Sequence, residues 1–302
     1  MGKEKAAASL KFSFCVPVYR TEKHLERCVR SILDQSWRDV EVIIVLDGPS
    51  PEAKRLYNRL WKNLPSVKLI EQDHAGVQRA RNRAFAEATG DIIVFWDSDC
   101  YAVPGIVRRW FNYFMADPKA DFIYGQYRYE EGDHLGGHFP NVPFDPYMLT
   151  TSNQCSTMSP MRRHVFPGWD EDLKRFQDWD VFLSITQRGG NGVLMPDIFF
   201  HTVPSDQDSI SGGTIPYAEA ARIIREKHGI SYRPIRVSCF AAPTYGLAVA
   251  KEIGADFENN PMRCDGYDHR LVYLMGFYMR DLTTHAMALQ EELGRYDEGQ
   301  AL

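Results

Sequence analysis

The chain has 302 residues, of which 44% are hydrophobic and 25% are charged, a composition typical of a soluble globular protein with one large core or two smaller ones. The formal net charge of -5 excludes a strongly basic protein and gives no reason to expect a nucleic-acid partner. The six cysteines never have C-x-x-C spacing, so we expect reduced thiols in a cytoplasmic protein rather than disulfides or a zinc site.

Two stretches bear on membranes. The N-terminal segment MGKEKAAASLKF contains no sustained apolar run, so we expect no signal peptide. The longest apolar stretch late in the chain, residues 271–279, is far too short to cross a bilayer, so we expect no transmembrane segment. Peripheral attachment to a membrane stays open.

The first hundred residues alternate between strand and helix patterns. Continuous apolar runs predict the strands, and apolar residues at helical spacing predict the helices. Strands are expected over residues 12–18, 41–46, 67–71 and 92–96, and helices are expected after the N-cap candidate Thr21, after Ser50-Pro51 and over residues 76–88. Buried strands that alternate with helices predict a mostly parallel sheet covered on both faces. In such sheets, ligands bind beyond the carboxyl ends of the strands.

The rest of the chain is less regular. We expect a helix after Pro104, a strand over 121–129, a loop-rich stretch over 130–165, a helix over 179–187, a strand over 192–200 and a mobile loop over 204–215. Beyond residue 213 the pattern predicts a mainly helical extension, with helices over 217–229, 245–254 and 268–295 and a short strand over 235–240.

Two carboxylates follow the fourth expected strand in the stretch FWDSDC. Asp97 and Asp99 repel each other and are costly to desolvate, so they need water around them or a cation between them. A lone D-x-D is also a common acidic turn. Phosphohydrolases with an aspartyl nucleophile carry D-x-D as well, but normally on the first strand, whereas here it follows the fourth.

Two longer stretches carry a resemblance to a known family. The segments CVPVYRTEKHLERCVRSILDQSWRDVEVIIVLDG and HAGVQRARNRAFAEATGDIIVFWDSD resemble the nucleotide-binding half of a family 2 glycosyltransferase. The segment FPGWDEDLKRFQDWDVFLSITQRGG resembles the acceptor-side motif of the same family. The resemblance implies the GT-A fold, which is α/β and Rossmann-like, with Asp97-Ser98-Asp99 as the D-x-D motif and Mn²⁺ or Mg²⁺ as the cofactor.

The resemblance also implies roles on the donor side. Asp99 matches the direct metal ligand, and Asp97 matches the residue that contacts the ribose or the water shell of the metal. The other implied nucleotide-binding residues are Pro17, Val18 and Tyr19 along the base and ribose, Asp47 as an acceptor from the base, Arg81 in preference to Arg79 and Arg83, and Ser98. His201 matches a late histidine that completes the metal site, although a lone histidine is more often structural.

On the acceptor side, Asp178 matches the catalytic base of the family. The family has an acidic pair there, but the first member in this chain is Gln177, and Asp180 is a nearby competitor. A single carboxylate suffices to take the proton of an attacking hydroxyl in an inverting transfer. Trp169, Asp170 and Glu171 match the acceptor pocket, although Trp169 is equally compatible with a place in the core.

Together these patterns predict an inverting, metal-dependent glycosyltransferase of the hexosyltransferase type, with a nucleotide-sugar donor, expected to be a UDP-sugar, and a carbohydrate or glycoconjugate acceptor. The alternative is a non-catalytic relative that binds a nucleotide or sugar. Residues 1–100 are expected to form the donor half and 101–212 the acceptor half. Residues 213–302 are expected to form an extension of unknown role, through which the chain could form oligomers.

Overall fold

The computed structural model describes residues 9–130, 143–151, 153–203 and 215–230. The chain divides into two units, Met1–Phe144 with Asn153–Ile224, and Asp145–Ser152 with Arg225–Leu302. In the second unit, the described part consists of helix α5 (Pro146–Thr151) and the end of helix α7 (Tyr217–Lys227). The first unit contains the sheet and every residue discussed below.

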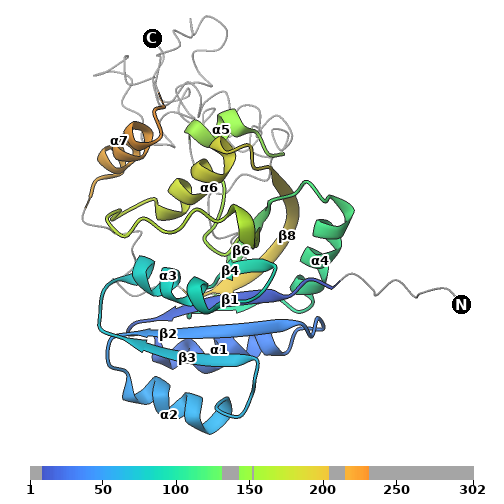
Figure 1. Cartoon of the computed structure of the whole chain (residues 1–302), viewed down its shortest axis with the longest axis vertical. Helices are drawn as coiled ribbons and strands as arrows, with labels where there is room; N and C mark the ends of the chain where they lie inside the picture. Colours follow the sequence, from blue (N-terminus) through green and yellow to red (C-terminus); the bar gives the residue numbers. More distant parts are fainter. Residues whose placement is uncertain (1–8, 131–142, 152, 204–214, 231–302) are drawn as a thin grey trace, which may run out of the picture. The chain divides into compact units, whose positions relative to one another are not determined.

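The first unit begins with the predicted alternation of strands and helices (Figure 1). The elements are β1 (Phe12–Val18), α1 (Glu22–Leu33), β2 (Val40–Asp47), α2 (Pro51–Leu60), β3 (Val67–Gln72), α3 (Val77–Glu87) and β4 (Ile92–Phe95). They are followed by β5 (Cys100–Ala102), α4 (Ile106–Ala116), β6 (Phe122–Tyr129), β7 (Met161–Arg162), the 3-10 helix η1 (Arg163–Val165), α6 (Gln177–Gln187) and β8 (Gly192–Thr202).

The strands form one sheet in the order β3-β2-β1-β4-β7-β6-β8-β5. The pairs β1–β2, β2–β3, β1–β4 and β6–β8 are parallel, whereas β4–β7, β6–β7 and β5–β8 are antiparallel. Val18 lies opposite Leu46, and Asp47 lies opposite Gln72. The carboxyl ends of β1, β2 and β3 therefore meet at one edge, as the sequence predicted, and β4 ends beside them.

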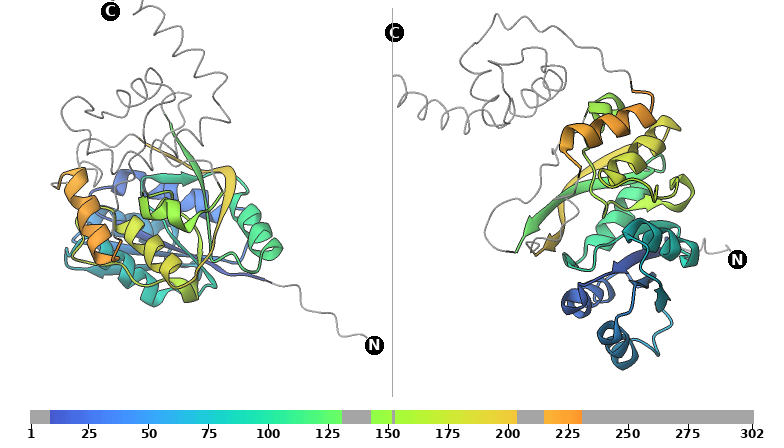
Figure 2. Two further views of the ribbon diagram at one scale, coloured as in Figure 1. Left: turned by 90° about the horizontal axis from the view of Figure 1, so that it is seen from above. Right: turned by 90° about the vertical axis from the view of Figure 1, so that its left-hand side faces the viewer.

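The two faces of this half of the sheet are covered by different helices (Figure 2). Alternate residues of β1, such as Phe14 and Val16, pack in one large cluster with the apolar sides of α1 and α4. Cys15, on the other face of β1, is also fully buried, and α3 contacts both β1 and β2. A strand that is buried on both faces must be apolar throughout, which explains the continuous runs in the sequence.

Four short elements were not predicted. The stretch 130–165, predicted to be loop-rich, also contains α5, β7 and η1, and the fourth element is β5. Strands of two or three residues are too short to show a period in the sequence, and tertiary pairing alone forms them. Ser50 caps α2 through the Ala53 amide at 3.3 Å. Thr21 occupies the N-cap position of α1, as predicted, but its side chain makes no capping hydrogen bond.

Other expectations have mixed outcomes. The four cysteines that the structure describes are buried and unpaired, as predicted. Among the described residues, no helix is both long and apolar enough to cross a bilayer. The loop over 204–215 falls almost wholly outside the described residues, and so do the strand over 235–240 and the helices over 245–254 and 268–295.

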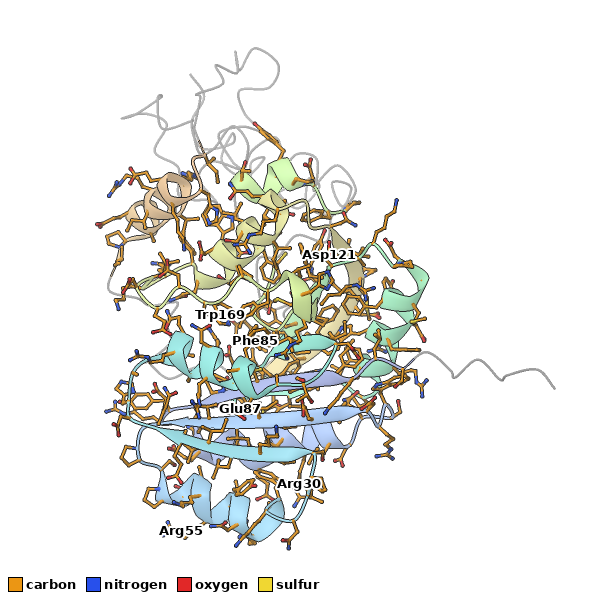
Figure 3. All side chains as sticks on the ribbon, viewed as in Figure 1. Arg30, Arg55, Phe85, Glu87, Asp121 and Trp169 are labelled. Atoms are coloured by element: carbon orange, nitrogen blue, oxygen red, sulfur yellow. The ribbon has the colours of Figure 1, made fainter. Side chains whose placement is uncertain are left out.

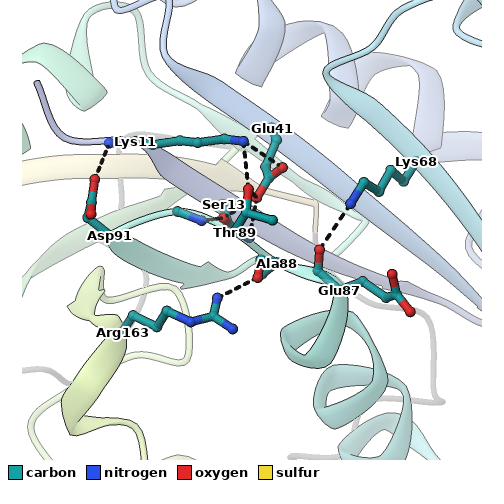
Figure 4. A network of polar contacts seen from close by, with 10 residues as sticks. Lys11, Ser13, Glu41, Lys68, Glu87, Ala88, Thr89, Asp91 and Arg163 are labelled. Carbon is teal, nitrogen blue, oxygen red and sulfur yellow. Dashed lines mark hydrogen bonds and ion pairs between the residues drawn. The ribbon is translucent and has the colours of Figure 1, made fainter.

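A buried polar network closes the sheet at the amino end of β1 and β2 (Figure 4). Glu41 accepts hydrogen bonds from Ser13 Oγ at 2.6 Å and from the Thr89 amide at 2.6 Å, and it pairs with Lys11 Nζ at 2.9 Å. Burial alone would raise the pKa of Glu41, but these hydrogen bonds lower it from 4.5 to about 2. The network lies at the end of the strands away from Asp97, so we assign it to stability.

We expect Glu41→Gln to lower the free energy of unfolding by about 1–3 kcal/mol at neutral pH, because Ser13, Lys11 and Thr89 lose a charged acceptor. The folded pKa of Glu41 is depressed, so its contribution is present above about pH 4.5 and disappears as the pH falls towards 2. Denaturant titrations at neutral and acidic pH should therefore give a smaller difference in acid. The exposed pair Lys54–Glu71 provides the control, and Glu71→Gln should change stability by less than about 0.5 kcal/mol.

Candidate active site

The D-x-D segment forms a tight turn directly after β4. The Cys100 amide donates to the Asp97 carbonyl at 3.0 Å, and the Trp96 indole donates to the Cys100 carbonyl at 3.0 Å. Ser98 is buried, and its hydroxyl lies 2.6 Å from that of Thr21. The hydroxyl of Thr21, the N-cap residue of α1, therefore bonds to this turn rather than to a backbone amide of the helix. The turn fixes where both carboxylates leave the backbone.

The two carboxylates of the turn have different environments. Burial, followed by the negative charge of Asp97, raises the pKa of Asp99 from 3.8 to about 6. Asp97 instead accepts a hydrogen bond from Arg81 Nη2 at 2.7 Å. The ionised form of Asp99 is thus poorly stabilised by the protein, and a cation beside it would supply the missing stabilisation.

Arg81 lies at the centre of the site. It is only 4% exposed, and its guanidinium lies 4.8 Å from the centre of the Trp169 ring. Its Nε is buried and has no hydrogen-bond partner among the described residues. Arg79 and Arg83 are exposed, so the predicted separation of Arg81 from its neighbours on α3 is confirmed. A charged side chain is rarely buried to this extent unless it is paired.

Asp178 lies in the first turn of α6 and also interacts electrostatically with Arg81. Burial raises its pKa, while a hydrogen bond from the Trp179 amide, the charge of Arg81 and a hydrogen bond from Asn153 oppose the rise. The Trp179 amide lies 2.9 Å from Asp178 Oδ1. Asp178 is only partly exposed, and a carboxylate with a raised pKa is a better proton acceptor than an ordinary one, which suits a general base.

The start of α6 is held by neutral groups. Gln177 donates to the Leu173 carbonyl at 3.3 Å, and Gln78 donates to the same carbonyl at 2.7 Å. Phe176, the residue before the helix, adopts a left-handed conformation with φ of 62°. A non-glycine residue in this region costs roughly 1–3 kcal/mol and often occurs at functional sites. Asp178 is therefore presented from a fixed but strained helix start, without a second carboxylate at position 177.

The segment before α6 is fastened to α3, and Figure 3 labels Trp169 within it. Asn82 accepts from the Trp169 amide at 2.9 Å and donates to the Trp169 carbonyl at 2.9 Å. Glu171 accepts from Asn82 at 3.1 Å and pairs with Arg79 at 3.3 Å. Asp170 accepts from the Asp172 amide at 3.0 Å. These bonds fix the segment relative to Arg81.

Two of the residues predicted to contact the acceptor are buried. Trp169 is 4% exposed and packs edge-on against Phe95. The Arg81 guanidinium lies over its ring, so the ring lacks an open face for a sugar. For Trp169 the structure therefore favours the core interpretation. Asp180 is also buried, one turn after Phe176. Asp170 and Glu171 remain on the accessible side of the segment.

The residues predicted to contact the base lie at the carboxyl ends of β1, β2 and β3. Pro17 and Val18 are buried within β1, whereas Tyr19 is 43% exposed. The Tyr19 ring is stacked on His74, with 4.1 Å between the ring centres. Asp47 is buried at the end of β2. The predicted nucleotide residues on these strands and on α3 therefore gather at one edge of the sheet.

His201, the third predicted metal ligand, lies on β8 beside β5, the strand that starts directly after Asp99. His201 is paired in register with Tyr101 across β5 and β8. Within the ranges that the structure describes, no three His, Cys, Asp or Glu side chains come close enough to hold a metal ion. Asp97 and Asp99 would supply carboxylate ligands to a cation at the turn, and His201 stays a prediction.

Comparison with known families settles the class of protein. The model of the family described as "Glycosyl transferase family 2" matches residues 13–169, which is more than half of the chain and includes Asp97 and Asp99. The chain belongs to glycosyl transferase family 2. The predicted family and the predicted class of enzyme, a glycosyltransferase, are thereby confirmed.

Relatives of this glycosyltransferase include much longer proteins. A chondroitin synthase and a hyaluronan synthase of Pasteurella multocida are each 28% identical to it over 182 residues, which is 59% of this chain and 19% of each relative. The chain thus spans about a fifth of the length of these curated relatives. A glycosyltransferase of Escherichia coli, YibD, is 33% identical over 31% of this chain and 27% of its own.

Solved structures confirm the GT-A type of fold. Staphylococcus aureus TarS 1-349, in complex with UDP-GlcNAc, matches with a TM-score of 0.62 and 17% identity over 72% of this chain and 66% of that one. The mannosyltransferase PcManGT of Pyrobaculum calidifontis, in complex with GDP-Man and Mn²⁺, matches with a TM-score of 0.53 and 15% identity over 91% of this chain and 88% of that one. At such identities the likeness establishes the fold alone.

Sequence reasoning overlooked several residues that the structure places at the site. His74 and Gln72 contact Asp47, while Gln78 and Asn82 hold the segment before α6. The signal for His74 was its position directly after the third strand, at the edge where ligands bind. Gln78 and Asn82 had no such signal, because their partners lie about ninety residues further along the chain.

Proposed function

We propose that this protein is an inverting, metal-dependent glycosyltransferase that moves a sugar from a nucleoside-diphosphate donor to an acceptor hydroxyl. One observation carries the proposal. The buried Arg81 binds Asp97 of the D-x-D turn and acts electrostatically on Asp178 of α6. The turn expected to bind the donor and the carboxylate expected to act as general base therefore both interact with the same guanidinium. Membership of the family supports the type of reaction.

The residues present suit a hard divalent cation such as Mn²⁺ or Mg²⁺. Asp99 carries a carboxylate whose ionised form the protein stabilises poorly, and Asp97 lies two residues away. Mg²⁺ is commonly bound by one or two carboxylates together with substrate phosphates and water, so two protein ligands suffice. When bound, the cation would neutralise the charge that develops on the departing diphosphate.

In the proposed reaction, Asp178 accepts the proton of the acceptor hydroxyl as its oxygen attacks the anomeric carbon. The new carbon–oxygen bond forms on the face opposite the leaving group. The bond to the diphosphate breaks at the same time, and its electron pair leaves with the nucleoside diphosphate. With Gln177 neutral, one carboxylate performs the proton transfer, which supports inversion rather than a two-step route.

The solved structures of the same fold bear on the nature of the donor. TarS was solved with UDP-GlcNAc and with UDP, and PcManGT was solved with GDP-Man. These neighbours support a nucleoside-diphosphate sugar, and we propose a UDP-sugar, as the sequence predicted. We keep residues 1–100 as the donor half, 101–212 as the acceptor half and 213–302 as an extension. A carbohydrate or glycoconjugate acceptor, a cytoplasmic location and contact with a membrane surface are parts of the same proposal.

The metal proposal gives a direct test. We expect Asp99→Ala to abolish Mn²⁺-dependent UDP binding, because the cation loses its main ligand. Folding should persist, because an ionised Asp99 is itself unfavourable in the folded protein. Wild-type affinity should fall as the pH drops through about 6, where a proton competes with the cation. Titration calorimetry with Mn²⁺ and with EDTA would measure both effects.

The exposed Asp172 supplies a matched control for this test. Asp172→Ala should bind UDP and Mn²⁺ like the wild type. Equal UDP affinity in wild type and Asp99→Ala, with and without metal, would contradict the assignment of the D-x-D turn. Metal-dependent UDP binding without transfer to any acceptor would favour the non-catalytic alternative.

A further inference from the structure

The carboxylate of Asp47 is saturated by its own chain. Gln72 Nε2 and the Ala75 amide donate to Oδ1 at 2.9 and 2.8 Å, and His74 Nδ1 and the Gly76 amide lie 3.0 and 2.9 Å from Oδ2. Asp47 is 2% exposed. An ionised carboxylate has about four acceptor positions. A ligand could reach Asp47 only by displacing one of these partners.

The contacts of His74 determine its tautomer. Nδ1 lies 3.0 Å from Asp47 Oδ2 and 3.2 Å from the Asp47 carbonyl oxygen, and neither atom can donate. Nδ1 must therefore carry the hydrogen. In the neutral ring, the other nitrogen, Nε2, then presents a lone pair. Nε2 has no hydrogen-bond partner among the described residues, and the side chain is 52% exposed.

The imidazole is fixed in position. One face is stacked on Tyr19, with 13° between the ring planes. Gly48 has φ of +115°, and a side chain there would touch both His74 and Tyr19. His74 follows β3, next to the ends of β1 and β2, at the edge of the sheet where Asp97 also lies. An oriented acceptor atom is thus held at the edge of the sheet where ligands of parallel α/β folds bind.

We infer that His74, rather than Asp47, reads the base of the donor nucleotide by accepting a ring N–H at Nε2. This inference rests on the proposed function, because it assumes that a nucleotide binds at this edge. Uracil, thymine and guanine present such a ring N–H. Cytosine and adenine present a bare ring nitrogen, whose lone pair would face that of Nε2. The site therefore selects bases by a repulsive contact as well as an attractive one.

The first test compares nucleotides. In alkaline buffer containing Mn²⁺, the full chain should bind UDP about ten- to a hundredfold more tightly than CDP by titration calorimetry. His74→Phe retains an aromatic ring against Tyr19 and removes both nitrogens, so the ratio should fall close to one. His164 is 73% exposed and remote from Asp47, so His164→Phe should leave the ratio unchanged.

The second test observes His74 itself. Nitrogen NMR of histidine-labelled protein, assigned through the loss of one signal in His74→Phe, should show the Nδ1–H tautomer. The Nε2 resonance should move when UDP is added and should not move when CDP is added. A hydrogen on Nε2, or an Nε2 signal that saturating UDP does not change, would overturn the inference.

The outcomes separate this inference from the function on which it rests. Equal UDP and CDP affinities, or an unchanged ratio in His74→Phe, would overturn the role of His74 and leave the glycosyltransferase proposal intact. Failure of the wild type to bind any nucleoside diphosphate, with or without metal, would overturn both.

Discussion

Replacing Asp178 with Asn is expected to slow sugar transfer by about a hundredfold to ten-thousandfold, the usual loss when a general base is removed. The amide has almost the same shape but cannot accept the proton of the acceptor hydroxyl. UDP and metal binding should stay close to wild type, because Asp97 and Asp99 are untouched. Steady-state transfer assays and calorimetry on the same preparations would measure the two effects separately.

The pH dependence of transfer provides a second readout of Asp178. Burial raises its pKa, and a base works only when it is deprotonated. The wild-type rate should therefore fall on the acid side at a pH above the ordinary range of an aspartate, and Asp178→Asn should lack this step. A carboxyl whose folded pKa is raised costs stability once it ionises, so the Asn variant should unfold at the same temperature or higher.

Asp180 is the control for this assignment, since it lies in the same turn of α6 but is buried. Asp180→Asn is expected to lose far less transfer activity, after correction for any loss of folded protein measured by calorimetric melting. If Asp180→Asn proves to be the inactive variant while Asp178→Asn transfers sugar normally, the roles of the two carboxylates must be exchanged.

Much of the donor half could be predicted, because strands that are buried on both faces must be apolar at nearly every position. β1 and β2 are apolar almost throughout, and the turn at Asp97 breaks the run after β4 abruptly. The hydrophobic effect alone therefore specifies the strands, and the edge that gathers Tyr19, Asp47 and Asp97 follows from their parallel order. The separation of Arg81 from its exposed neighbours followed in the same way from helical spacing.

The rest depended on contacts between distant segments. β7 has two residues and forms because β4 and β6 flank it. Thr21 is a typical N-cap residue in the sequence, but the sequence does not show which partner its hydroxyl bonds to. In the structure that partner is Ser98 rather than a backbone amide. Trp169 suits a sugar platform and a core position alike, and only the fold shows that Arg81 covers its ring. At such positions the type of side chain indicates the possible roles, and tertiary packing determines which of these roles the residue has.

Arg81 should be the most sensitive non-carboxylate residue of the site. We expect Arg81→Met to reduce kcat/KM by about a hundredfold or more, because removing one partner of a buried ion pair leaves the other charge uncompensated. The loss of unfolding free energy should be about 1–3 kcal/mol, less than for a fully buried ion pair. The reason is that Asp97 is one-third exposed, so water can replace part of the interaction. Transfer kinetics and denaturant titration would give both numbers.

Two readouts separate a central charge from simple packing. The charge of Arg81 lowers the pKa of Asp178, so Arg81→Met should move the acid limb of transfer to higher pH. In a double-mutant cycle with Asp97→Asn, the two losses of stability should be clearly less than additive, because each change removes the same ion pair. Arg79→Met, on the exposed face of α3, should alter stability by less than about 0.5 kcal/mol and leave the acid limb in place. Additive losses together with an unmoved acid limb would mean that Arg81 acts only by filling space beneath Trp169.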